Sequence, residues 1–271
     1  MLMPRRVRVD AELVRRGLAR SRQHAAELID AGKVGIDGMP AVKPSTAVAA
    51  DAVLTVTDHG ERCWVSRGAH KLIGALDTLA ITVAGRRCLD AGASTGGFTE
   101  VLLDRGASEV IAVDVGYGQL AWSLRCDPRV VVVERTNVRE LSPDRIAGCV
   151  DVVVADLSFI SLGTVLPALV RCASPSADIV PMVKPQFEVG KGQVGSGGVV
   201  RDPQLRADSV LAVARQAEAL GWHTTGVTAS TLPGPSGNVE YFLRLRAQTD
   251  TALMGEALVG AVRAAVAEGP Q

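Results

Sequence analysis

One glycine-rich turn constrains the fold of this chain more than any other feature. Residues 88–98 read CLDAGASTGGF, in which a short apolar segment runs into three glycines and then into a segment typical of a helix. Glycines at 92, 96 and 97 let the backbone turn sharply and leave its N–H groups open to a ligand at the helix start. The pattern predicts a strand, a turn and a helix of an α/β sheet.

An acidic residue follows at the spacing expected of a nucleotide-binding fold. The next apolar segment, VIAVDVG, contains Asp114, which lies 22 residues after Gly92. In βαβ nucleotide-binding folds a carboxylate at this spacing binds ribose hydroxyls. The turn reads G-x-x-x-G-G and not G-x-G-x-x-G, which favours a ligand with a single nucleoside over a dinucleotide. A tight turn that binds no ligand is the alternative. A side chain at Gly96 is expected to collide with the ligand and to leave the fold largely intact.

Length and composition predict one large domain, one small domain and a cytoplasmic location. The chain has 271 residues, of which 47% are hydrophobic, enough for a sizeable α/β core and a small appended module. We find no apolar run of 18 residues and no apolar segment near the N-terminus, so we expect neither a membrane span nor a signal peptide. The five cysteines form no C-x-x-C motif, which favours buried, reduced thiols over disulfides or a metal site.

The first 22 residues are strongly basic although the net charge is zero. They carry seven arginines against Asp10 and Glu12. The arginines are at positions 5, 6, 8, 15, 16, 20 and 22. A solvated face is one interpretation, but their concentration beside two short predicted helices favours a polyanion, and nucleic acid is the most common one in the cytosol.

The N-terminal pattern resembles a known RNA-binding module. Asp10 and Ser21 are predicted N-caps of two short helices, and strands over 33–36 and 53–56 follow, with a tight turn at Asp37-Gly38. The stretch VRVDAELVRRGLARSRQHAAELIDAGKVGIDG resembles the S4 RNA-binding domain. The resemblance implies that the helices present basic residues to RNA phosphates. The residues it indicates are Arg6, Arg8, Arg20, Arg22 and Lys43, with Lys33 as a further candidate.

Four charged residues lie at the ends of predicted elements in the rest of the chain. Asp156 ends the segment CVDVVVAD, Lys184 ends ADIVPMVK, Glu240 precedes YFLRL and Lys71 lies on the helix that enters the domain. Each one alone is more typical of a solvated strand end. Because ligands of doubly wound sheets bind at strand carboxyl ends, the four together favour mutual pairing around one pocket.

The segment from residue 71 to 246 resembles the FtsJ-type methyltransferase domain. The resemblance implies S-adenosylmethionine as cofactor, no metal, and a Lys-Asp-Lys-Glu set for ribose 2′-O-methylation, here Lys71, Asp156, Lys184 and Glu240. It places seven residues against the cofactor, namely Asp90, Gly92, Ala93, Ser94, Gly96, Phe98 and Asp114. With the linker Arg62-Cys63-Trp64-Val65, the whole chain resembles the haemolysin A family of rRNA methyltransferases.

The full-length resemblance implies a domain plan and a substrate. We expect an S4-like RNA-binding domain of α+β type over 1–60, a linker over 61–67 and a doubly wound, Rossmann-like α/β methyltransferase domain over 68–271. The implied substrates are cytidine 2′-hydroxyls of 16S and 23S rRNA, with an influence on susceptibility to ribosome-targeting peptide antibiotics. The partner would be rRNA or a ribosomal subunit, with no DNA and no stable membrane association.

Three other functions stay open at this point. A base methyltransferase is one, because Asp156-Leu157-Ser158-Phe159 loosely resembles the acid-Pro-Pro-aromatic motif that holds an exocyclic amine, although both prolines are missing. A non-catalytic ribosome-assembly factor is another. A haemolysin that acts on membranes is the third, and the missing signal peptide and membrane span argue against it. Methyl transfer to rRNA and membrane lysis are assays that separate them.

Overall fold

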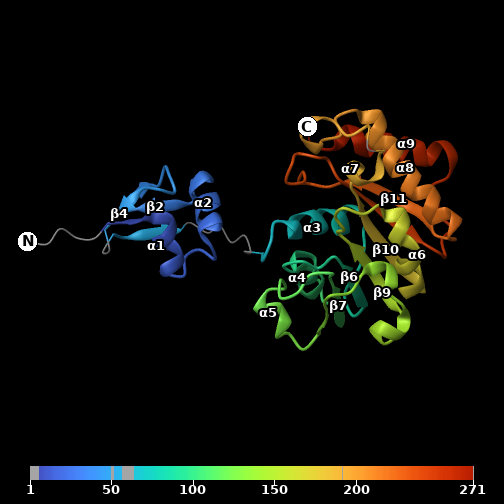
Figure 1. Cartoon of the computed structure of the whole chain (residues 1–271), viewed down its shortest axis with the longest axis horizontal. Helices are drawn as coiled ribbons and strands as arrows, with labels where there is room; N and C mark the ends of the chain where they lie inside the picture. Colours follow the sequence, from blue (N-terminus) through green and yellow to red (C-terminus); the bar gives the residue numbers. More distant parts are fainter. Residues whose placement is uncertain (1–5, 50–51, 57–63, 191, 271) are drawn as a thin grey trace, which may run out of the picture. The chain divides into compact units, whose positions relative to one another are not determined.

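The chain divides into two compact units between residues 63 and 64 (Figure 1). A computed structural model describes residues 6–49, 52–56, 64–190 and 192–270. The predicted linker residues Arg62 and Cys63, and Arg5 of the basic cluster, lie outside the described residues. Each unit has its own buried apolar core.

The smaller unit packs two helices on short antiparallel strands. Its elements are β1 (Val7–Arg8), α1 (Val9–Arg15), α2 (Arg22–Asp30), β2 (Val34–Ile36), β3 (Met39–Pro40), β4 (Ala47–Val48) and β5 (Leu54–Val56). Strand β1 pairs with β4, and the second sheet has the order β3-β2-β5. The core residues Val9 and Leu13 of α1, and Ala25 and Ile29 of α2, are each four residues apart and therefore share one helix face.

Two of the predicted local signals in this unit are confirmed and one is wrong. Ser21 is the N-cap of α2, and its Oγ accepts a hydrogen bond from the backbone N–H of His24 at 3.1 Å. Asp37 and Gly38 join β2 to β3 with left-handed φ angles of 50° and 82°. Asp10, however, lies inside the first turn of α1, and the N-cap is Arg8. The Asp10 carboxylate accepts hydrogen bonds from Arg8 and Arg22.

The larger unit is an α/β domain with one seven-stranded sheet. Its helices are α3 (Gly68–Thr78), α4 (Gly97–Asp104), α5 (Trp122–Arg125), α6 (Leu162–Cys172), α7 (Pro185–Glu188), α8 (Pro203–Ala219) and α9 (Gly255–Glu268). Its strands are β6 (Arg87–Ala91), β7 (Glu109–Val113), β8 (Val130–Val133), β9 (Val150–Ala155), β10 (Ala173–Val183), β11 (His223–Ala229) and β12 (Tyr241–Arg246). The order of strands is β11-β12-β10-β9-β6-β7-β8.

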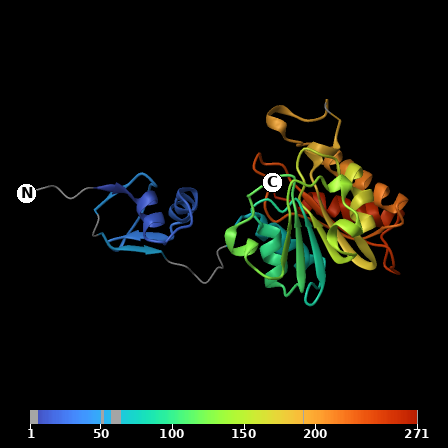
Figure 2. The same ribbon diagram turned by 60° about the horizontal axis from the view of Figure 1, so that its bottom comes forward.

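Helices cover both faces of this sheet (Figure 2). On one face, apolar residues of α3, α4 and α5 form a core cluster with residues of the strands. On the other face, apolar residues of α6, α8 and α9 form a second cluster. Neighbouring residues of one strand, such as Cys88 and Leu89 or Val152 and Val153, belong to opposite clusters. Because strand side chains alternate between faces, a strand buried on both sides must be apolar throughout. The predicted doubly wound α/β class is confirmed.

One strand departs from the predicted parallel sheet. Strand β12 lies between β10 and β11 and runs antiparallel to both. Its amino end therefore lies at the edge of the sheet where the parallel strands have their carboxyl ends. In the register of the sheet Val183 faces Tyr241 and Ala91 faces Ala155. Lys184 is consequently beside Glu240, and Gly92 is beside Asp156.

Two further observations concern expectations from composition. None of the helices in the described part of the chain is long and apolar enough to cross a membrane. Cys88 and Cys172 are buried, whereas Cys126 and Cys149 are exposed, and all four are free. The predicted burial is therefore wrong for Cys126 and Cys149. Cys126 directly follows α5, Cys149 directly precedes β9, and both lie at the surface.

Candidate active site

The glycine-rich turn connects β6 to α4 in a conformation that requires glycine. Gly92 has a φ of 89°, and a Cβ atom there would lie 2.4 Å from the carbonyl oxygen of Asp156. The ends of β6 and β9 can therefore approach each other only because residue 92 has no side chain. This close approach brings the turn and Asp156 into one site.

Asp114, at the end of β7, is held by the turn. Its Oδ2 accepts the backbone N–H of Ser94 at 2.8 Å, and its Oδ1 accepts that of Gly116 at 2.7 Å. A carboxylate oxygen has more than one lone pair, so both oxygens can accept further hydrogen bonds from a ligand. Asp114 lies on a cavity of about 440 Å³ together with Gly92, Ser94, Val115, Gln119, Asn137, Val138, Asp156, Leu157, Ser158, Phe159, Ile160 and Val165.

A second carboxylate is buried beneath the turn. Asp90 is fully buried, and its Oδ2 accepts a hydrogen bond from Thr99 Oγ1 at 2.7 Å. Its Oδ1 is buried and has no hydrogen-bond partner among the described residues. Burial raises the pKa of this carboxyl to about 7. Asp90 is not among the residues that line the cavities at this turn, so it supports the turn from below.

The structure corrects the expectation for Gly96. Its φ is 101°, and an added Cβ atom would lie 2.3 Å from Leu124 Cδ1 and 2.8 Å from Leu120 Cδ1. Both leucines belong to the core cluster on this face of the sheet. A side chain at residue 96 would therefore disturb the core, and residue 96 lines neither of the two cavities at the turn.

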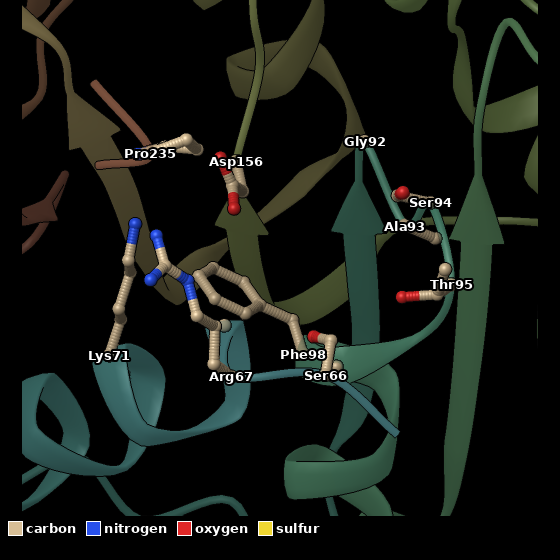
Figure 3. A pocket seen from close by; sticks show the side chains of 12 residues that line it. Ser66, Arg67, Lys71, Gly92, Ala93, Ser94, Thr95, Phe98, Asp156 and Pro235 are labelled. Atoms are coloured by element: carbon tan, nitrogen blue, oxygen red, sulfur yellow. The ribbon is translucent and has the colours of Figure 1, made fainter. Parts of the chain in front are cut away.

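A smaller cavity of about 230 Å³ opens on the other side of Asp156. Figure 3 shows Lys71 and Arg67 extending from the start of α3, with Asp156 at the end of β9 and Pro235 above Lys71. The remaining lining residues are Ser66, Gly68, Gly92, Ala93, Ser94, Thr95, Gly97 and Phe98. Because both cavities include Gly92, Ser94 and Asp156, a ligand in one would contact the wall of the other.

Two lysine–carboxylate pairs lie at this edge of the sheet. Lys71 Nζ is 2.5 Å from Glu240 Oε2, with side chains that are 7% and 2% exposed. Lys184 Nζ is 2.6 Å from Asp156 Oδ1 and donates a second bond to Ser158 Oγ at 3.1 Å. A buried charge is tolerated only when a partner compensates it, so each lysine keeps its position through its carboxylate.

Gly234 makes room for one of these pairs. A Cβ atom at residue 234 would lie 2.8 Å from Glu240 Oε1. The segment from 230 to 240 therefore folds closely around the Glu240 carboxylate, with the Gly234 N–H bonded to the Asn238 carbonyl and the Ser230 N–H bonded to the Glu240 carbonyl. This packing orients Glu240 toward Lys71.

The structure brings most predicted site residues together. The four charged residues form the two ion pairs. The cavities are lined by Gly92, Ala93, Ser94, Phe98 and Asp114. Asp90 is buried beneath them. Three site residues were not predicted from the sequence: Asn137 and Arg67, which line the cavities, and Ser158, which binds Lys184. Asn137 and Ser158 each follow the carboxyl end of a strand, and this position was the signal that could have indicated them.

Carboxylates also organise the arginines of the smaller unit. Arg8 and Arg22 both bond to Asp10, at 2.8 Å and 3.1 Å, and the hydrogen bond from Arg8 is the main reason that the pKa of Asp10 falls to about 2. Glu12 bonds in the same way to Arg15 and Arg16, at 2.6 Å and 2.7 Å. The remaining predicted RNA-binding residues, Arg6, Arg20 and Lys43, are exposed. The guanidinium groups are thus oriented, and the surface keeps a positive excess.

Comparison with known proteins identifies both units. The profile of FtsJ-like methyltransferases matches residues 64–247, most of the chain. The chain belongs to the FtsJ-like methyltransferase family. Residues 7–54 match the S4 domain. We therefore refer to the larger unit as the methyltransferase unit and to the smaller as the S4 unit.

Several known proteins match most of this chain. The chain is 76% identical over 268 residues to the 16S/23S rRNA (cytidine-2′-O)-methyltransferase TlyA of Mycobacterium tuberculosis, covering 99% of this chain and 100% of the relative. It is 34% identical to Hemolysin A of Brachyspira hyodysenteriae, covering 87% of this chain and 98% of the relative. A solved structure from Streptococcus thermophilus is 35% identical, with a TM-score of 0.74 and 98% coverage of both chains.

Proposed function

We propose that this methyltransferase transfers the methyl group of S-adenosylmethionine to the ribose 2′-hydroxyl of cytidines in 16S and 23S rRNA. The observation that carries the proposal is Asp156, which lines both cavities and holds the buried Lys184 ammonium at 2.6 Å. A relative that is 76% identical is named for this reaction. The partner is rRNA, in a ribosomal subunit or on its own.

The larger cavity fits the nucleoside part of the cofactor. Asp114 has free lone pairs for ribose hydroxyls, and Asn137 is a second polar residue on the same cavity. Gly92 lines the same cavity, and because it has no side chain it leaves the backbone of the turn open to the cofactor. When bound, S-adenosylmethionine supplies a methyl group that its sulfonium has already activated.

The smaller cavity fits the nucleotide that receives the methyl group. A hydroxyl oxygen is a weak nucleophile, so the protein must orient it and stabilise the charge that develops when its proton leaves. Lys184 can donate a hydrogen bond to that oxygen while Asp156 holds the ammonium in place. Lys71, held by Glu240, lines the smaller cavity, and its positive charge can bind ribose or phosphate oxygens there.

The S4 unit supplies RNA affinity in this proposal. Its exposed arginines keep free N–H donors for phosphate oxygens, and such contacts position an RNA without reading its sequence. Selection of the target nucleotide then depends on the fold of the rRNA and on the shape of the cavity.

Replacing one 2′-hydroxyl tests the target atom. We expect an rRNA fragment with 2′-deoxycytidine at the modified position to bind with nearly unchanged affinity and to receive no methyl group. The matched control is the same fragment with the deoxy sugar at the adjacent nucleotide, which should be methylated. Mass spectrometry of nucleoside digests locates the methyl group. A methyl group on the base, or methylation of the deoxy position, would overturn the proposal.

A further inference from the structure

The two lysines of the site differ in the number of their partners. Lys71 Nζ has one side-chain partner among the described residues, Glu240. Lys184 Nζ has two, since it contacts Asp156 Oδ1 at 2.6 Å and Ser158 Oγ at 3.1 Å. Ser158 also lines the larger cavity. The Ser158 hydroxyl therefore contacts Lys184, the lysine that the proposed function places next to the nucleophile.

The loop that carries Ser158 is anchored at both ends. At its start, the Asp156 N–H bonds to the Ala91 carbonyl at 3.0 Å. At its end, the Glu188 carboxylate accepts bonds from Ser161 Oγ at 2.7 Å and from the Leu162 N–H at 2.8 Å. Glu188 belongs to α7, the short helix that directly follows Lys184. The loop and the lysine are thus fixed to each other by contacts other than the Ser158 bond itself.

Two bonds to an ammonium group determine where its third N–H points. The ammonium has three N–H groups in a tetrahedral arrangement, so a single partner leaves two of them open. With Asp156 and Ser158 both bound, one N–H position is left for a substrate oxygen. Fixing this position beforehand lowers the entropy cost of reaching the reactive arrangement.

A hydroxyl group also differs from a carboxylate in what it can bind. An ionised carboxylate only accepts hydrogen bonds, whereas a serine hydroxyl can accept from an ammonium or donate to a neutral amine. The contact between Ser158 and Lys184 therefore persists whichever protonation state the lysine has during the reaction. The Asp156 carboxylate binds mainly the protonated, charged form of Lys184.

We propose that Ser158 is a positioning residue for Lys184, which directs the free N–H or lone pair of the lysine at the ribose hydroxyl. The proposal rests on the function proposed above, because it assumes that Lys184 contacts the nucleophile. It gives the segment Asp156-Leu157-Ser158-Phe159 a role in ribose chemistry that differs from holding an exocyclic amine.

Substitutions at residue 158 in the full-length protein test this role. We expect Ser158→Ala to lower kcat on rRNA by roughly 10- to 100-fold, because a displaced reactive group costs this much. The KM for rRNA and the Kd for S-adenosylmethionine, measured by calorimetry, should stay within about two-fold. Ser158→Thr keeps the hydroxyl and should restore kcat to within about three-fold of wild type. Ser123→Ala, at an exposed serine of α5, is the matched control and should leave all three constants unchanged.

The outcomes separate this proposal from the proposed function. A wild-type protein that transfers methyl groups to the base, or none at all, overturns both. If the wild type methylates the ribose, the role of Ser158 is overturned by any of three results. These are a kcat of Ser158→Ala within two-fold of wild type, a Ser158→Thr variant as slow as Ser158→Ala, or a loss of cofactor affinity as large as the loss of kcat. Unchanged melting temperatures of both variants show that the fold is intact.

Discussion

The S4 unit and the methyltransferase unit both pair cations with buried carboxylates, but they differ in the exposure of the cation. In the S4 unit the Asp10 side chain is 5% exposed, whereas that of its partner Arg22 is 59% exposed. In the methyltransferase unit both members of the Lys71–Glu240 pair are buried. Asp10 therefore orients a guanidinium that faces solvent. Glu240 compensates the charge of a buried ammonium.

This difference in exposure explains the different roles. An exposed guanidinium keeps several N–H donors for phosphate groups and can bind any RNA backbone. A buried ammonium can act only on what enters its cavity, and there it acts strongly because little water screens it. In the proposed function, a cation paired with a carboxylate therefore serves affinity in the S4 unit and chemistry in the methyltransferase unit.

The largest expected effect comes from removing the buried cation nearest the proposed nucleophile. We expect Lys184→Ala to lower the rate of methyl transfer by about 10² to 10⁴-fold, the usual contribution of a positioned proton-transfer or electrostatic group. The Kd for S-adenosylmethionine should change by no more than a few-fold, because the proposed function places the lysine at the nucleophile and not at the cofactor. Single-turnover methylation and calorimetry measure the two quantities. A rate within ten-fold of wild type would remove Lys184 from the mechanism.

Two buried aspartates sharpen the comparison because their pKa values are shifted in opposite directions. Burial raises the pKa of Asp90 to about 7, so the folded state favours the protonated acid. The stabilisation that this side chain gives the folded state is fully present below about pH 4, the pKa of an aspartate in the unfolded chain. It is lost as the pH rises toward 7. Relative to Asp90→Asn, the free energy of unfolding of the wild type should fall by up to about 4 kcal/mol over this window.

Asp10 is expected to behave in the opposite way. Arginines lower its pKa to about 2, so its stabilising effect is present above pH 4 and is lost as pH falls from about 4 to 2. Tryptophan fluorescence follows the methyltransferase unit alone, because all three tryptophans, Trp64, Trp122 and Trp222, lie in it. Circular dichroism follows both units. Parallel pH profiles of wild type and Asp90→Asn between pH 4 and 7 would contradict the assigned pKa of Asp90.

Breaking one ion pair in each unit compares their energies directly. Lys71→Met leaves the Glu240 carboxylate buried without a cation, and we expect a loss of about 3 kcal/mol in the free energy of unfolding. Arg15→Ala removes an exposed partner of Glu12 and should lower the free energy of unfolding much less, because water screens an exposed pair. Adding Glu240→Gln to Lys71→Met should recover part of the loss. The comparison fails if urea denaturation finds equal costs for Lys71→Met and Arg15→Ala.

The smallest expected effect concerns the exposed cations. We expect Arg20→Glu combined with Lys43→Glu to weaken rRNA binding about ten-fold and to reduce the salt dependence of the affinity by about one unit for each phosphate that is no longer neutralised. Both side chains are exposed, whereas Arg8→Glu would place a carboxylate against Asp10 and disturb the fold. Binding assays at several salt concentrations measure the slope, with Arg263→Glu on α9 as the matched control. A slope equal to that of the wild type would show that these residues do not bind phosphates.

The local patterns of the sequence predicted much of this protein. Short-range interactions control a helix cap such as Ser21, a tight turn such as Asp37-Gly38 and the change from β6 to α4 after Gly92, so neighbouring residues alone indicate them. Continuous apolar strands alternating with helices predicted a sheet covered on both faces. A sheet of this kind brings the carboxyl ends of its strands to one edge, which is why Asp156 and Lys184 could be expected near the turn.

Only the tertiary structure decided which of these groups meet. The antiparallel insertion of β12 beside β10 places Glu240 at the site, and the pairing of Lys71 with Glu240 and of Lys184 with Asp156 joins residues far apart in the chain. The same holds for Gly96, whose neighbours Leu120 and Leu124 lie on a later segment, and for Asp10, which bonds to Arg22 of α2. Periodicity and composition indicate which secondary structure one segment prefers. The residue that pairs with a buried charge, or that an added Cβ atom would meet, depends on how separate segments pack together.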